Sequence, residues 1–275
     1  MIRTLRAGQA PEASWEESFV EDAPLKTWTE RDGRLLRLRL NRPKANVLDG
    51  SMVEALSQAL TRELSAPHLT AVLLDAEGPH FSFGASVAEH MPGRCAAMLS
   101  SLHALLLQMT EAPVPILAAV RGQCLGGGLE LVCAATLIFA TPDAKFGQPE
   151  IKLGVIAPAA SCFLPERLGP ARAEDLLVSG RSLEAAEAYS VGLVHSVADD
   201  AETAALAYFD SQLAQLSASS LRFALRAARM GTVERMRVKL AAVEKLYLGE
   251  LMATRDPIEG LSAFMEKRLP RWEDR

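Results

Sequence analysis

Two glutamates, Glu130 and Glu150, stand twenty residues apart in apolar surroundings. Glu130 is the only charged residue between Arg121 and Asp143, and Glu150 follows a proline and precedes an apolar stretch. Two carboxyl groups that face one pocket suit the addition of water, with one as the general base and the other as the general acid. Each glutamate taken alone has a simpler interpretation, as an acid in the first turn of a helix or as a surface residue in a loop.

Two short stretches of small residues offer backbone N–H groups for a developing negative charge. The run Gly126-Gly127-Gly128 follows a predicted strand and opens an apolar segment. If a helix begins there, its unpaired N–H groups and the positive end of its dipole can hold an oxyanion. Gly84, Ala85 and Ser86 follow another predicted strand, at the end of which α/β proteins usually bind ligands. An ordinary loop is the alternative for this second stretch.

Several other catalytic motifs are missing. The segment Gly84–Ala88 lacks the final glycine of a nucleophile elbow. No Lys-Ser or Lys-Thr pair follows Gly122–Gly128, and Gly126–Leu131 does not match the dinucleotide-binding fingerprint. The four cysteines form no CxxC pair, and the five histidines lack the spacing of a zinc site. Serine hydrolysis, nucleotide hydrolysis and dinucleotide redox chemistry therefore lose their sequence support, and we expect no metal.

The elements that must position these residues follow an α/β pattern. Residues 36–40 alternate between leucine and arginine, which predicts a strand with one buried face. Further buried strands are predicted at 71–74, 116–120 and 137–140. Helices are predicted from Ser51, where Ser51–Glu54 has capping-box spacing, over 96–109, and from about Gly127. This order predicts right-handed βα units around a mostly parallel sheet.

The C-terminal part has a different character. Apolar residues recur with a helical period between Met236 and Leu251, and a last helix is predicted from Asp256, followed by proline and an acid. Nothing after about residue 200 has the pattern of a strand. We expect an N-terminal tail over 1–24, an α/β core over 25–195 and an all-helical module over 196–275.

Composition narrows the class of protein. The 275 residues are 49% hydrophobic and 23% charged, which is enough to build a sizeable core and excludes global disorder. A formal net charge of −5 argues against nucleic acid or an anionic membrane surface as the main partner. The N-terminal residues carry no apolar signal segment, and 125–142 contains Glu130 and three glycines, so it is no membrane span. We expect a cytoplasmic protein with four reduced core thiols.

Taken together, in this order and spacing, the motifs around Ala85, Gly127, Glu130 and Glu150 resemble those of the crotonase (enoyl-CoA hydratase/isomerase) superfamily. The resemblance runs from about Trp28 to the C-terminus. It implies a spiral of ββα units with a C-terminal helical module that assembles trimers or dimers of trimers. It also implies an acyl-CoA thioester as substrate, with no separate cofactor. The amides of Ala85 and Gly127 would polarise the thioester carbonyl, and the two glutamates would hold and activate water.

The same resemblance implies contacts with coenzyme A. Two segments would lie near the adenine end and beside the first oxyanion donor, and a C-terminal segment would reach the nucleotide bound by a neighbouring subunit. The residues concerned are Lys44, Ala45, Ser86, Val87, Phe264 and Lys267.

Departures from the common hydratase pattern point to a subgroup. Ser86 stands where an acid is usual, and Val155–Cys162 replaces the usual Pro-Gly-x-Gly-Gly segment. With residues 80–91 and 272–275, this variant is most similar to members that hydrate cyclohexa-1,5-diene-1-carbonyl-CoA to 6-hydroxycyclohex-1-ene-1-carbonyl-CoA in anaerobic benzoyl-CoA breakdown. For this reaction we expect Glu130 to deprotonate the water and Glu150 to protonate the distal γ carbon, although the sequence does not fix which glutamate donates which proton. A straight-chain enoyl-CoA hydratase and a catalytically silent CoA-ester or RNA-binding scaffold are the alternatives.

Overall fold

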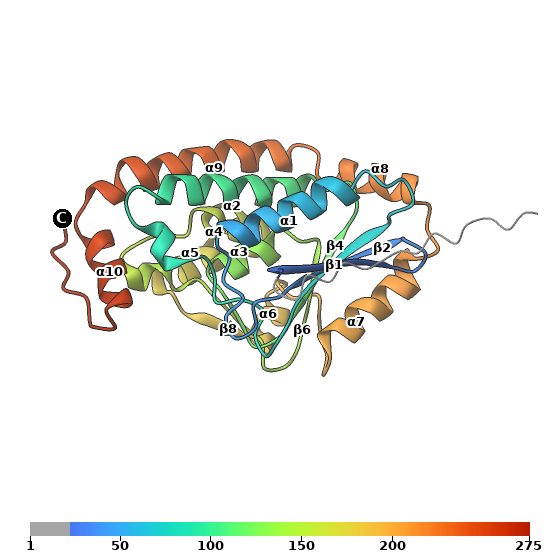
Figure 1. Ribbon diagram of the computed structural model, residues 1–275, viewed down its shortest axis with the longest axis horizontal. Coiled ribbons are helices and arrows are strands. Elements are labelled where there is room, and N and C mark those ends of the chain that lie inside the picture. Colours follow the sequence, from blue (N-terminus) through green and yellow to red (C-terminus); the bar gives the residue numbers. More distant parts are fainter. Residues whose placement is uncertain (1–22) are drawn as a thin grey trace, which may run out of the picture.

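A six-stranded sheet forms the centre of the protein in the computed structural model, which describes residues 23–275. The strand order is β1-β2-β3-β4-β6-β9, with β1 and β2 antiparallel and all other neighbours parallel. The predicted α/β class with a mostly parallel sheet is therefore confirmed (Figure 1). The strands are β1 Leu25–Glu30, β2 Leu35–Leu40, β3 Ala71–Ala76, β4 Ile116–Val120, β6 Leu137–Ala140 and β9 Ser196–Val197.

A second, three-stranded sheet lies beside the ends of the first. It consists of β5 (Gln123–Leu125), β7 (Lys145–Gly147) and β8 (Ser182–Glu184), in the order β5-β7-β8. Because β5 and β7 are parallel and Leu125 pairs with Gly147, the residues that follow the two strands leave the sheet side by side. Those residues are the glycine run at 126–128 and the segment that contains Glu150.

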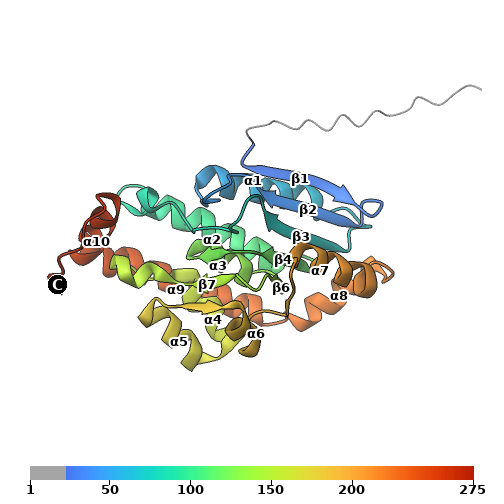
Figure 2. The same ribbon diagram turned by 90° about the horizontal axis from the view of Figure 1, so that it is seen from below.

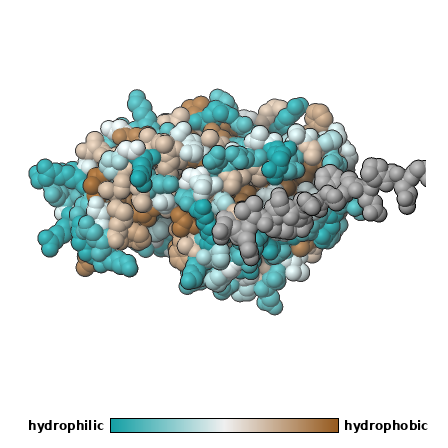
Figure 3. Space-filling view, in the orientation of Figure 1, coloured by the Kyte–Doolittle hydropathy of each residue, from teal (hydrophilic) through white to brown (hydrophobic). Residues whose placement is uncertain are grey.

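Helices cover both faces of the main sheet. The helices are α1 Gly50–Glu63, α2 Cys95–Glu111, α3 Gly127–Cys133, α4 Pro158–Leu168, α5 Pro170–Ser179, α6 Ala185–Ser190, α7 Ala201–Tyr208, α8 Ala218–Ala228, α9 Thr232–Gly249 and α10 Asp256–Met265, with short 3-10 helices η1 Val87–His90, η2 Pro149–Leu153 and η4 Leu251–Ala253 and a π turn η3 Phe209–Leu213. Helices α1 and α2 lie on one face with α9 packed along α2, and α7 lies on the other face (Figures 1 and 2). Each face has its own apolar cluster. On the outer surface seen in Figure 3, apolar residues are interspersed with hydrophilic ones.

Strand β2 differs from its prediction, because both of its faces are buried. Arg37 was expected to face solvent, yet only 2% of it is exposed. Its guanidinium pairs with Asp75 at 2.8 Å and Glu30 at 2.7 Å, and also with Glu202 of α7. Helix α7 covers this face, and the three carboxylates compensate the charge that it buries.

The start of α1 also differs from its prediction, which placed the first helical residue at Ser51. The helix begins at Gly50, and Asp49 is its N-cap, with the carboxylate accepting the Met52 N–H at 3.0 Å. Ser51 donates to the same carboxylate and does not cap the helix itself. Arg42 also pairs with the Asp49 carboxylate, which helps to hold it at the cap position.

The C-terminal residues fold back across α10. The backbone N–H groups of Glu273 and Asp274 donate to the carboxylate of Asp256, at 2.7 and 2.9 Å. The Trp272 ring lies against Gly154, where a Cβ atom would stand 3.0 Å from the indole. This C-terminal strap, residues 270–275, thereby joins α10 to the end of η2.

Candidate active site

Three loops meet where the two sheets adjoin. The Ser82 carbonyl accepts the Leu125 N–H at 3.0 Å, and the Gly147 carbonyl accepts the Gly126 N–H at 2.9 Å. The Ala45 carbonyl accepts the Phe83 N–H at 2.9 Å, which adds a fourth segment at the rim. Segments that are far apart in the sequence thus lie side by side.

The Ala85 and Gly127 amides are brought together by close backbone packing. A Cβ atom on Gly84 would lie 3.2 Å from the Gly127 nitrogen, and one on Gly127 would lie 3.0 Å from the Ala85 nitrogen. Gly84 and Gly126 have φ angles of 100° and 51°, which side-chain-bearing residues rarely adopt. Neither the Ala85 nor the Gly127 amide donates a hydrogen bond to another residue within 23–275. Two neighbouring donors without protein acceptors form the arrangement that binds an oxyanion.

Glu130 lies in the first turn of α3 and is 4% exposed. Its carboxylate accepts the Ala160 N–H at 2.8 Å, and this N–H is one of the unpaired donors at the start of α4. Burial raises the pKa of Glu130, and the hydrogen bonds from Ala160 and Ala159 and the nearby His103 oppose that rise. These N–H groups and His103 therefore offset part of the cost of burying an ionised carboxylate at Glu130.

Glu150 lies in η2 with its carboxyl group against the Gly126 backbone. A Cβ atom on Gly126 would stand 2.5 Å from Glu150 Oε1, so only glycine leaves room for this carboxyl group. With its nitrogen turned toward Glu150, the buried Gln148 amide reaches both carboxyl oxygens, at 2.8 and 3.1 Å. Burial, followed by the charge of Glu130, raises the pKa of Glu150 to about 8. The direction of this shift is that of a carboxyl group that holds its proton more tightly than usual.

A cavity of about 60 Å³ opens beside Glu150. Helix α10 closes one side of it through Leu261. The lining is mostly apolar, and its two titratable side chains within 23–275 are Glu150 and His90. The lining residues are Phe83, Gly84, Ala85, Val87, His90, Gly126, Pro149, Glu150, Leu153, Val155 and Leu261.

The predicted coenzyme A residues divide into two groups. Ala45 and Ser86 lie at the rim formed by the loops, Val87 lines the cavity, and Lys44 is exposed next to Ala45 with a φ of 90°. Phe264 and Lys267 lie at the end of α10 with their side chains exposed on the surface of the chain. The structure does not bring these two residues to the cavity.

Sequence reasoning missed three features of the site. Gln148 precedes the Pro149-Glu150 pair and holds its carboxyl group, but a lone glutamine in a loop carries no signal. The amides of Ala159 and Ala160 were detectable, because Pro158 marks the first turn of a helix, where N–H groups are unpaired. His90 was noted only as part of a longer segment.

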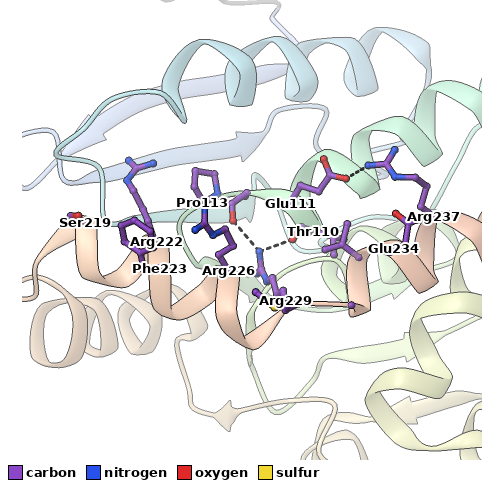
Figure 4. A pocket seen from close by; sticks show the side chains of 14 residues that line it. Thr110, Glu111, Pro113, Ser219, Arg222, Phe223, Arg226, Arg229, Glu234 and Arg237 are labelled. Atoms are coloured by element: carbon purple, nitrogen blue, oxygen red, sulfur yellow. Dashed lines mark hydrogen bonds and ion pairs between the residues drawn. The ribbon is translucent and has the colours of Figure 1, made fainter.

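A larger cavity, of about 640 Å³, lies between the C-terminal end of α2 and helices α8 and α9 (Figure 4). Several of its arginines hold the protein together: Arg229 donates to the carbonyls of Thr110 and Ala112, and Arg237 pairs with Glu111. Its lining has four arginines and two acids, Glu111 and Glu234, and Glu111 is paired with Arg237, so its charge is opposite to that of the Glu130–Glu150 pair.

The remaining polar chemistry is limited. Within residues 23–275, no three His, Cys, Asp or Glu side chains converge as a metal site would require. All four cysteines are free and buried. None of the helices described is sufficiently long and apolar to cross a membrane.

Comparison with known proteins shows the class of enzyme to which the chain belongs. Residues 30–275 match the family model described as enoyl-CoA hydratase/isomerase, and the chain belongs to this family. Among characterised relatives, it is 64% identical over 253 residues to the cyclohexa-1,5-dienecarbonyl-CoA hydratase of Thauera aromatica, covering 92% of this chain and 98% of that protein. A probable enoyl-CoA hydratase of Mycobacterium tuberculosis is 36% identical over 251 residues, covering 90% and 97%.

Solved structures show the same fold. An enoyl-CoA hydratase/isomerase from Pseudoalteromonas atlantica superposes with a TM-score of 0.79 at 30% identity, covering 90% of this chain and 99% of that one. A putative enoyl-CoA hydratase from Mycobacterium avium paratuberculosis superposes with a TM-score of 0.81 at 25% identity, covering 91% and 99%. The expected crotonase-like fold with C-terminal helices is therefore confirmed. The predicted all-helical range 196–275 begins two residues too early, because Ser196–Val197 form β9 at the edge of the main sheet.

Proposed function

We propose that this protein hydrates cyclohexa-1,5-diene-1-carbonyl-CoA to 6-hydroxycyclohex-1-ene-1-carbonyl-CoA. The observation that carries the proposal is the 64% identity to the Thauera aromatica hydratase over nearly the whole of both chains. The mostly apolar lining of the cavity beside Glu150 favours an apolar acyl group. Coenzyme A is part of the substrate, and the reaction needs no further cofactor.

In this proposal Glu130 is the general base. Its carboxylate takes one proton from a water molecule while the water oxygen bonds to the carbon β to the thioester. The electron pair of the ring double bond moves toward the thioester oxygen, where the Ala85 and Gly127 amides stabilise the negative charge. The Ala160 N–H supports this role, because it favours the ionised form of Glu130 before attack.

Glu150 is the general acid in the same scheme. The charge is spread over a dienolate, which extends to the γ carbon across the ring. Glu150 donates its proton there, and the remaining double bond stays conjugated with the thioester. The raised pKa of Glu150, about 8, supports this role because the group is protonated at neutral pH. A final proton transfer from Glu130 to Glu150 restores the starting state.

Assembly and location are further parts of the proposal. Several large apolar side chains of α8, α9, α10 and the turn between α8 and α9 are exposed on the single chain, among them Phe223, Met230, Val238 and Phe264. We infer that these helices mediate a homotrimer or a dimer of trimers in the cytoplasm. Phe264 and Lys267 would then contact the coenzyme A bound by a neighbouring subunit, while Lys44, Ala45, Ser86 and Val87 contact that of their own.

A substrate panel tests the function. The protein is incubated with the cyclic dienoyl-CoA, crotonyl-CoA and longer straight-chain enoyl-CoA esters, and the products are identified by mass. We expect a gain of one water on the cyclic ester at a rate at least tenfold above that on crotonyl-CoA. Faster hydration of crotonyl-CoA would favour a straight-chain hydratase. Binding of every ester without any hydration would favour a silent scaffold.

A further inference from the structure

The imidazole of His90 is the cavity-lining titratable group that the scheme above leaves unused. It lies at the end of η1, the short helix that follows the oxyanion donor Ala85. Its ring lines the same cavity as Glu150 and Leu261. The other cavity-lining side chains described are apolar or absent, so His90 and Glu150 supply the polarity of this space.

The protonation of this ring is fixed by its contacts. Nδ1 lies 2.9 Å from the Ser86 backbone carbonyl oxygen. A carbonyl oxygen only accepts hydrogen bonds, so Nδ1 carries the hydrogen in this contact. Burial lowers the pKa of His90, although the Ser86 contact and the charge of Glu89 oppose that shift. At neutral pH the ring is therefore neutral, and Nε2 has a free lone pair.

No residue within 23–275 hydrogen-bonds this Nε2 atom. It is also not closed off in the interior, unlike Nε2 of His103, which is buried without a partner. A neutral acceptor without a protein partner, on a ring that lines a mostly apolar cavity, is suited to an O–H group of the ligand. An O–H group in an apolar cavity is unfavourable unless it finds such an acceptor.

We propose that His90 is a further substrate-contacting residue, whose Nε2 accepts the hydrogen that remains on the water oxygen after attack. This inference rests on the proposed hydration. Water enters with two hydrogens, of which one passes to Glu130 and the other stays as the hydrogen of the new ring hydroxyl group. His90 binds this second hydrogen, orients the water oxygen toward the β carbon, and afterwards holds the hydroxylated product. No proton is transferred to His90, and the atom balance of the reaction is unchanged.

Two variants separate the two ring nitrogens. In His90→Asn the side-chain amide can still donate to the Ser86 carbonyl, as Nδ1 does, but it ends short of Nε2. In His90→Gln the side-chain amide oxygen can reach the place of Nε2. If His90 mattered only through its tie to the Ser86 loop, Asn would preserve activity better than Gln. If Nε2 is the acceptor, Gln preserves it better.

Steady-state kinetics are measured in both directions, with the cyclic dienoyl-CoA and with its 6-hydroxy product. For His90→Asn we expect kcat for hydration to fall about tenfold with KM for the diene within twofold, which corresponds to the loss of one neutral hydrogen bond. Because both directions share one equilibrium constant, kcat/KM for dehydration must fall by the same factor. For His90→Gln we expect a loss of no more than about threefold. The same changes at His195, an exposed histidine beyond the site, are the controls and should leave kinetics unchanged.

Binding provides a second readout that does not depend on turnover. In a Glu130→Gln background, which suppresses interconversion of the two esters, calorimetry should show that adding His90→Asn weakens binding of the hydroxy ester about tenfold and leaves binding of the unsaturated ester unchanged. Equal behaviour of Asn and Gln, or better activity and binding in Asn, overturns the proposal for His90. Failure of the wild type to hydrate the diene refutes the proposed function, and the hydroxy-ester affinities then still decide the role of His90.

Discussion

Gly127 packs so closely on Ala85 that a methyl group added to it would stand 3.0 Å from the Ala85 nitrogen. Gly127→Ala should therefore push the two amides apart without straining its own helical backbone. We expect kcat to fall about 100-fold, in the range seen when one oxyanion donor is lost, while the melting temperature changes little. Gly249→Ala is the matched control, since no atom within 4 Å meets the added methyl group. A Gly127→Ala enzyme with wild-type kcat would remove the Gly127 amide from the site.

Replacing either glutamate by glutamine should separate chemistry from binding. In Glu130→Gln the amide oxygen can still accept from Ala160, and in Glu150→Gln the side chain keeps its volume, so both variants should fold. We expect kcat losses of about 10²–10⁴-fold, the usual contribution of an acid or base, and CoA-ester affinities within a few-fold of wild type. Glu184→Gln, at an exposed glutamate paired with Lys145, is the control. Near wild-type turnover in either variant would take that glutamate out of the mechanism.

The raised pKa of Glu150 predicts the alkaline side of the pH profile. An acid must be protonated to act, so kcat/KM should decline as pH rises through about 8. The decline belongs to the Glu130–Glu150 pair, because their titrations are coupled. Glu150→Gln has no proton to lose there and should give a flat residual profile between pH 7 and 9. A wild-type profile that is flat over this range would contradict the assignment of Glu150 as the acid.

The raised pKa of Glu150 also makes the stability of the fold fall as the pH rises. Between the ordinary value of 4.5 and about 8, folded Glu150 keeps a proton that the unfolded chain has lost. Its contribution to the free energy of unfolding is therefore complete below about pH 4.5 and is lost as pH rises toward 8. Urea titrations from pH 5 to 8 should show a shallower decline for Glu150→Gln than for the wild type. An equal slope in both proteins would mean that Glu150 titrates normally in the fold.

Asp75→Asn should destabilise the protein strongly. Asp75 is fully buried and pairs with Arg37 at 2.8 Å and with Arg39 at 2.7 Å. The substitution leaves two guanidinium groups with less compensation, and breaking a buried pair costs about 3–5 kcal/mol. Asp175→Asn, which breaks an exposed pair with Arg181, should cost less than 1 kcal/mol. Urea denaturation distinguishes the two, and similar losses in both variants would show that burial is not the cause.

Tyr247→Phe should have the opposite effect on stability. Tyr247 is fully buried in α9, and its hydroxyl lies beside the Cys95 thiol, a weak partner, without a hydrogen bond of ordinary geometry within 23–275. Removing a buried unsatisfied hydroxyl should raise the free energy of unfolding by about 1 kcal/mol. Tyr189→Phe, at an exposed tyrosine, is the control and should leave stability unchanged. Destabilisation by Tyr247→Phe would show that the hydroxyl is satisfied in the fold, with the Cys95 thiol as the neighbouring partner.

Short apolar runs in the sequence were enough to predict several of the buried strands. Strands β4 and β6 have the predicted bounds, 116–120 and 137–140, because each is a short apolar run with clear ends. The buried state of Arg37 could not be predicted, since its partners Asp75 and Glu202 come from distant segments. Likewise, the sequence did not show that Asp49 is the cap of α1 or that Arg42 pairs with its carboxylate.

In the candidate active site, too, some features could be predicted from the sequence and others depend on contacts between distant segments. Residue types and order identified the two glutamates and the two glycine-containing stretches, because their chemistry is restricted to few side chains. The acid–base assignment depends on which backbone amides reach Glu130 and how deeply Glu150 is buried, and both follow from packing between η2, α3 and α4. The roles of Gln148 and His90 can be inferred only from their positions beside Glu150, which the sequence does not give.

The C-terminal strap has a practical consequence for handling the protein. Glu273 and Asp274 are anchored on Asp256, and Trp272 rests on Gly154, four residues beyond Glu150. We expect an affinity tag fused after Arg275 to disturb these contacts and, through Trp272, the turn that carries Glu150. Recombinant versions should therefore carry their tags at the other end of the polypeptide, or have them cleaved before rates are compared.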